Sequence, residues 1–207
     1  MRPTFRTALC LSVVLSLGVG AAAIAADAKK AAPASAAKAG GVSAWTVDKA
    51  NSKIRFRSAF SGTAFEGGFA KWDAQINFDP KNLAGSKAVV SVDLASAGTG
   101  DSDRDSTLPS ADWFNVAKFP RAVFTSTAIK DLGGGKYEAA GTLSLRGVTK
   151  PVTLPFTLAI TGDTAKMSGQ VVLNRSQYGV GQGQFAAADT VPFEVTVPVT
   201  VVAKRAS

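Results

Sequence analysis

The sequence contains no histidine, and its one cysteine, Cys10, lies close to the N-terminus. Serine and cysteine nucleophiles that histidine activates are therefore excluded, and so are zinc sites built from histidine or cysteine. Iron–sulfur clusters and histidine-ligated haem need the same side chains. We therefore predict no catalytic residues, no metal and no cofactor.

Charge is missing from residues 8–26, which follow two arginines. The run ends in small residues, with Ala23 and Ala25 at the spacing that a signal peptidase reads, so residues 1–25 are predicted to be a cleaved signal peptide. An uncleaved anchor is the alternative, because the run is close to the roughly 20 residues that a spanning helix needs. A cleaved signal predicts a periplasmic protein.

Residues 26–43 lack aromatic side chains and have no β-branched residue before Val42. This alanine- and lysine-rich stretch cannot bury enough apolar surface to offset its ordering entropy, so it is predicted to be a flexible linker. The rest of the chain, residues 44–207, suits a single domain with one core.

Acidic residues are fewer than basic ones, 15 against 23, which gives a formal charge of +8. Basic and apolar residues alternate, as where Arg55 and Arg57 flank Phe56, and this is typical of solvated strand faces. Peripheral contact with an anionic membrane is the alternative. No nucleic-acid partner is expected, because no aromatic-basic motif for stacked bases is present.

Long helical patterns are also scarce, and alternation with period two dominates. It is clearest in residues 152–160, where every second residue is apolar. Such runs predict half-buried strands. We count eight or nine with short connections, and only the segment 102–114 favours a helix. The pattern predicts an all-β fold, a lipocalin-like antiparallel barrel of about eight strands, in preference to a two-sheet sandwich.

The predicted inward faces mix large side chains with small ones such as Gly141 and Gly169. The small residues either leave space for a ligand or complement large neighbours in a packed core. The pattern alone leaves both open. Carboxylates are absent from these faces, so a general base would have to be an exposed acid, and we predict that the protein is not an enzyme.

Residues 101–105 resemble the start of a calcium-binding loop, with aspartate at alternate positions. However, Ser106 stands where such a loop needs glycine, and Arg104 places a positive charge inside it. Helix capping explains the aspartates better.

Two long spaced motifs go beyond these patterns, RDSTLPSADWFNVAKFPRAVFTS at 104–126 and GTLSLRGVTKPV at 141–152. With the opening WTVDKANSKIRF at 45–56, they resemble the signature segments of the YceI-like family across residues 45–203.

The resemblance implies a usually periplasmic barrel whose lumen takes a polyisoprenoid, an isoprenoid quinone tail or another long amphiphile. The segment from Arg175 through Tyr178 to Gly183 resembles a subgroup associated with cytochrome b561, which implies a membrane protein of that type as a partner. Many members of that family carry histidines near the first signature strand, where this chain has Asn51 and Ala59-Phe60, so no head-group contact through histidine is expected.

We predict a carrier protein that holds an isoprenoid lipid or quinone; the alternative is a solidly packed barrel that serves as accessory subunit of a membrane redox protein. Trp113 and Phe114 are expected to cover one barrel end, and Arg175 and Tyr178 to lie near a head group, unless Arg175 instead donates hydrogen bonds to loop carbonyls. The inward side chains predicted to touch the ligand are Phe56, Trp72, Ile76, Leu143, Phe156 and Leu158.

Overall fold

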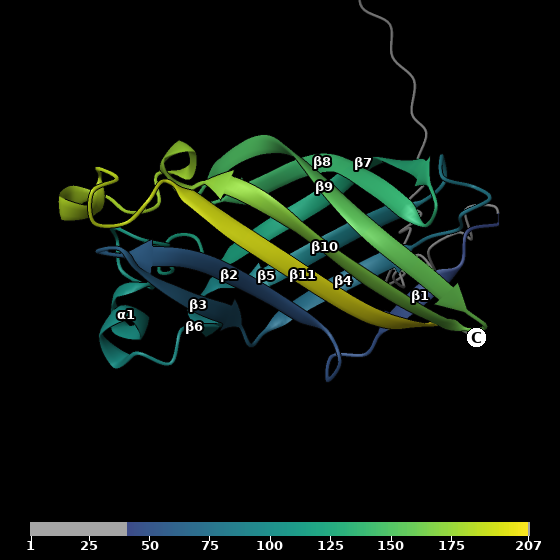
Figure 1. Cartoon of the computed structure of the whole chain (residues 1–207), viewed down its shortest axis with the longest axis horizontal. Helices are drawn as coiled ribbons and strands as arrows, with labels where there is room; N and C mark the ends of the chain where they lie inside the picture. The colour runs from purple at the N-terminus through teal and green to yellow at the C-terminus, as the bar shows by residue number, and fades with distance from the viewer. Residues whose placement is uncertain (1–40, 207) are drawn as a thin grey trace, which may run out of the picture. The chain divides into compact units, whose positions relative to one another are not determined.

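The alternating segments form one antiparallel sheet in the computed structural model, which describes residues 41–206 (Figure 1). The predicted signal peptide and most of the predicted linker lie outside the described residues. The strands are β1 (Ala44–Val47), β2 (Lys53–Phe60), β3 (Thr63–Phe69), β4 (Trp72–Asn77), β5 (Lys87–Asp93), β6 (Ala97–Gly98), β7 (Arg121–Gly133), β8 (Lys136–Leu145), β9 (Val148–Thr161), β10 (Thr164–Asn174) and β11 (Glu194–Arg205).

The sheet closes on itself because β1 pairs with both β4 and β11. β2 continues from β1 along β11, β3 leads into β4, and β6 follows β5, so that the eleven segments make eight barrel strands. This confirms the predicted all-β barrel. Closure leaves no long exposed sheet edge and surrounds a lumen with the inward side chains.

Within residues 41–206, helix is limited to α1 (Ser102–Thr107) and three short 3-10 turns, η1 (Leu94–Ser96), η2 (Arg175–Tyr178) and η3 (Gly183–Phe185). α1 is shorter than the predicted helix, which reached residue 114. Pro109 explains the early end, because it has no N–H to donate to a helical carbonyl. No helix among residues 41–206 has the length and apolar character needed to cross a bilayer.

The barrel core has two parts. Leu94, Phe114 and Tyr178 lie in the part near α1, and Trp45 and Phe78 lie in the part near β1. In Figure 1, α1 and the turns η2 and η3 are at one end of the barrel, while β1 and the C-terminus are at the other. These two ends are called the α1 end and the β1 end below.

At two of the small inward residues, Gly141 and Gly169, neighbouring atoms already occupy the space that a side chain would need. A Cβ on Gly141 would lie 2.4 Å from the Thr125 carbonyl oxygen and 2.8 Å from the Phe124 ring. A Cβ on Gly169 would lie 2.5 Å from the Pro155 carbonyl oxygen. These glycines therefore complement their neighbours and open no space of their own.

Gly141→Ala is therefore expected to destabilise the fold by about 1 to 3 kcal/mol, because the carbonyl oxygen of a paired strand cannot move aside. Urea denaturation gives the change. Gly68→Ala is the matched control, because its Cβ would meet the nearest atom at 3.4 Å, an ordinary contact. Equal stability of the two variants would contradict the assignment.

Candidate ligand-binding site

An apolar cavity of about 220 Å³ lies at the α1 end of the lumen. Its wall is apolar and comes from strands all around the barrel, together with residues that follow α1. We call it the α1-end chamber. The residues predicted from sequence that line it are Phe56, Trp113, Phe114, Leu143, Arg175 and Tyr178.

A second apolar cavity of about 130 Å³ lies towards the β1 end. Ile76, Phe156 and Leu158 line it, as predicted for inward positions, and so do Trp45 and Met167. We call it the β1-end chamber. With two chambers in its lumen, the barrel is not packed solid.

The two chambers adjoin at four residues that line both, Val90, Phe124, Leu154 and Val199. These side chains come from β5, β7, β9 and β11: Val90 and Phe124 are direct partners on neighbouring strands, while Leu154 and Val199 lie further round the barrel. We call them the waist. These four residues were not predicted from the sequence as ligand contacts. Leu154 and Val199 nevertheless lie in runs that alternate between apolar and polar residues, which is the pattern that predicted the other lumen residues.

Trp72 corrects the prediction for its position, because it lines neither chamber. Its ring lies under the Lys49 ammonium, 4.0 Å from the ring centroid, and borders a groove on the outside of the barrel. Trp72 has the inward parity of Ile76 but stands at the first position of β4, where it pairs with Val92 of β5 on one side and has no strand partner on the other.

Trp113 belongs to the cover of the α1-end chamber. It lies in a turn after α1, with its ring centroid 5.2 Å from that of Phe185 and 5.8 Å from the Arg175 guanidinium carbon. Within the described residues, its indole Nε1 and the hydroxyl of Ser58, which also lines this chamber, are buried without a hydrogen-bond partner. Such donors are costly to leave unpaired.

Arg175 holds the cover together and is only 3% exposed. Its Nε donates to the Pro192 carbonyl at 3.0 Å. Nη1 donates to two carbonyls, Val180 and Gly181, and Nη2 to Ala187 and Val191, over 2.6 to 3.2 Å.

All five guanidinium N–H groups therefore have backbone acceptors. Burial lowers the pKa of Arg175 from its ordinary value, but an arginine keeps its charge in a protein. The structure thus favours the structural alternative for this residue, because no donor is left free for a head group.

Tyr178 is the second predicted head-group residue, and it is 2% exposed. Burial raises the pKa of its hydroxyl. Gly179 ends η2 in the left-handed region, at φ 67°, and the amides of Gly181 and Gln182 both donate to the Asp112 carbonyl at 2.8 Å. The loop after η2 and the turn after α1 therefore form one joined cover.

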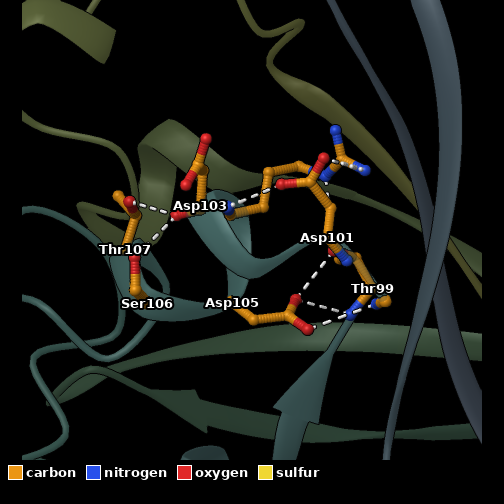
Figure 2. A network of polar contacts seen from close by, with 8 residues as sticks. Thr99, Asp101, Asp103, Asp105, Ser106 and Thr107 are labelled. Carbon is orange, nitrogen blue, oxygen red and sulfur yellow. Dashed lines mark hydrogen bonds and ion pairs between the residues drawn. The ribbon is translucent and has the colours of Figure 1, made fainter.

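The carboxylates of Asp101, just before α1, and of Asp105 within it serve as structural acceptors (Figure 2). Asp101 caps the helix by accepting from the Arg104 amide at 3.0 Å, and Asp105 accepts from the amide and hydroxyl of Thr99 at 2.6 and 2.7 Å. The Thr99 hydroxyl lowers the pKa of Asp105. Among residues 41–206, no three potential metal-binding side chains of histidine, cysteine, aspartate or glutamate come together.

Comparison with known proteins matches a YceI-like domain to residues 45–203. The UPF0312 protein VPA0850 of Vibrio parahaemolyticus is 33% identical over 151 residues, which cover 72% of this chain and 70% of that protein. Protein YceI of Escherichia coli O157:H7 is 44% identical over 111 residues, 53% of this chain and 58% of that protein, so this match spans little more than half of the relative.

Two solved structures have the same fold. BcnA of Burkholderia cenocepacia superposes with a TM-score of 0.73 at 35% identity, over 75% of this chain and 98% of that one. A polyisoprenoid binding domain from Saccharophagus degradans, implicated in plant cell wall breakdown, has a TM-score of 0.60 at 16% identity, over 80% of this chain and 100% of that one.

Proposed function

The chain belongs to the YceI-like domain family, and on that basis we propose that it is a periplasmic carrier whose barrel lumen holds a long-chain isoprenoid lipid or isoprenoid quinone without doing chemistry on it. The observation that carries the proposal is the pair of adjoining apolar chambers, which follow the lumen from the α1 end to the β1 end. The Saccharophagus degradans domain is described as binding polyisoprenoid in this same fold.

An apolar chain suits this lumen because the chamber walls present almost no polar atoms. Burial of each methylene contributes about 0.8 kcal/mol, so a long prenyl chain can bind tightly with few polar contacts. The two chambers meet at a waist and extend along the barrel, which favours a linear chain over a compact ring system.

The head group is proposed to lie at the α1 end. Trp113 and Ser58 line that chamber, and their Nε1 and hydroxyl groups are buried without a partner; a side-chain rotation that turns these donors toward the lumen would let a neutral oxygen acceptor such as a quinone carbonyl accept from them. A phosphate would need a charged partner, and the one cation that lines this chamber, Arg175, already has acceptors for all its donors. This favours quinone or prenol over prenyl phosphate.

Native mass spectrometry of the protein purified from its own host tests the proposal. We expect an added mass that corresponds to one isoprenoid chain, with a minor fraction of free protein. Extraction into organic solvent should release the same compound, and a quinone would show its absorbance change on reduction with borohydride.

Protein purified after denaturation and refolding without lipid is the control, and it should show only the mass of the chain. Addition of a prenyl quinone to this refolded protein should restore the adduct. A barrel that purifies empty from its host and takes up no prenyl chain would refute the carrier function and favour an accessory subunit, for example of a cytochrome b561-type protein.

A further inference from the structure

The barrel wall has a gap in its strand pairing. β1 pairs with β4 as far as Trp45 and Ile76, and β2 pairs with β3 only from Arg55 and Gly68 onward. In between, residues 46–54 and 69–75 form no ladder with one another. Side chains alone close this part of the wall, and Lys49 reaches across it to the Trp72 carbonyl.

A groove of about 740 Å³ lies outside this gap. Four cations line it, Lys49, Lys53, Arg55 and Lys71, against one acid, Glu66. Trp72 stands at its border. We call it the seam groove.

The charges of the seam groove are only partly neutralised. Glu66 accepts from both Arg55 and Arg57, so one carboxylate serves two guanidinium groups. Lys49 pairs with Asp73 at 2.9 Å.

Lys53 and Lys71 are exposed, and their ammonium groups take part in none of the ion pairs found among residues 41–206. A net positive charge therefore remains on this side of the barrel.

The seam groove is also next to the lumen. Ile54 and Phe69 line both the groove and the α1-end chamber, so a single layer of apolar side chains separates them. In most of the rest of the wall, the backbone hydrogen bonds of paired strands lie between the lumen and the outside, although the ladder between β9 and β10 also ends at Phe156 and Gly169.

We propose that the seam groove docks the barrel on a bilayer, where Lys53, Lys71 and their cationic neighbours bind the phosphates of anionic lipid head groups. Basic residues near an anionic membrane are attracted to it, and a tryptophan such as Trp72 favours the interface between head groups and acyl chains. The docked face then places this gap in the strand pairing against the membrane.

Sedimentation with lipid vesicles tests this docking. The protein should bind vesicles that contain 30% phosphatidylglycerol more tightly than pure phosphatidylcholine vesicles, and salt should release it, because exposed charges are screened within about 10 Å at 0.1 M. The double variant Lys53→Gln, Lys71→Gln should bind roughly 30-fold more weakly, at about 1 kcal/mol for each basic residue.

Lys130→Gln, Lys166→Gln is the matched control. It removes the same charge from exposed positions on β7 and β10, away from the gap, and should keep nearly full binding. An equal loss in both double variants would overturn the proposal in favour of diffuse charge. Full competition by millimolar glycerol phosphate would also overturn it, because the site would then be one for a soluble anion.

Trp72 gives a second readout of the same contact. Brominated phosphatidylglycerol should quench part of the protein's emission, and Trp72→Phe should remove that quenching, because Trp45 is buried in the core and Trp113 lines the lumen. Quenching unchanged in Trp72→Phe would place another face on the membrane. Native mass spectrometry of the lysine variants measures the lipid held in the lumen. It therefore tests the carrier function separately from membrane docking.

Discussion

Replacing Arg175 with methionine is expected to lower the free energy of unfolding by about 3 kcal/mol or more and to loosen residues 179–193. The substitution keeps an apolar stem but removes donors from five carbonyls at Pro192, Val180, Gly181, Ala187 and Val191. Each buried acceptor left without a donor costs about 1 to 3 kcal/mol, although water admitted to the loop would recover part of that. Urea denaturation measures the total, and amide hydrogen exchange locates the loosened segment.

Arg146→Met is the matched control for this prediction. Arg146 donates through Nη2 to a single carbonyl, that of Ala111, and the same substitution there should cost about 1 kcal/mol. An Arg175→Met protein with an unchanged urea midpoint and a selective loss of quinone binding over plain hydrocarbon binding would assign Arg175 to the head group instead.

Arg175 also shows what sequence reasoning could not decide. The segment around it, with glycines at 179, 181 and 183, predicts a tight loop, and a donor-rich side chain inside such a loop fits either a ligand or loop carbonyls. The choice depends on where the carbonyls of residues 180–192 point. Spacing along the chain carries no information about that.

Alternation predicted the lumen well where strands are long and continuously paired. Phe156 and Leu158 in β9 and Leu143 in β8 line the chambers as expected, because side chains of a paired strand must alternate between its two faces. Trp72 has the same parity but stands beside the interrupted pairing, where the wall no longer fixes the direction of a side chain. Alternation of apolar residues predicts which face of a strand a side chain lies on. It does not predict whether the strand has a paired neighbour at that residue.

The lumen and the outer surface of the barrel carry different kinds of side chain. Among residues 41–206, acidic and basic side chains lie on the outside, except Arg175, whose charge faces carbonyl dipoles, and Lys87, which lines the β1-end chamber from an exposed position. The chamber surfaces therefore offer a ligand apolar area, and the unpaired donors of Ser58 and Trp113 are buried behind the wall of the α1-end chamber. Affinity should then depend mainly on chain length, and the waist is the place where chain length can be tested.

Leu154→Trp should divide the lumen at the waist and abolish the carriage of long chains. Leu154 lines both chambers, so an indole in its place would project into the passage between them. A chain then confined to the α1-end chamber loses the burial of at least four methylene equivalents, about 3 kcal/mol, and its affinity should fall more than about 100-fold. Binding of prenyl quinones with two and with eight isoprene units, followed by native mass spectrometry, measures the difference.

Thr153→Trp is the control on the adjacent, outward-facing position of β9, and it should leave binding of both quinones unchanged. The waist variant itself should lose about 1 to 3 kcal/mol of stability to overpacking, which leaves a folded barrel if the starting stability is ordinary. Because the other lining residues of the α1-end chamber are unchanged, Leu154→Trp should still bind the short quinone within a few-fold of the unaltered protein. If a folded variant loses binding of both quinones equally, the waist determines the shape of the α1-end chamber as well. If binding of the long quinone is undiminished, the chain does not pass between the chambers.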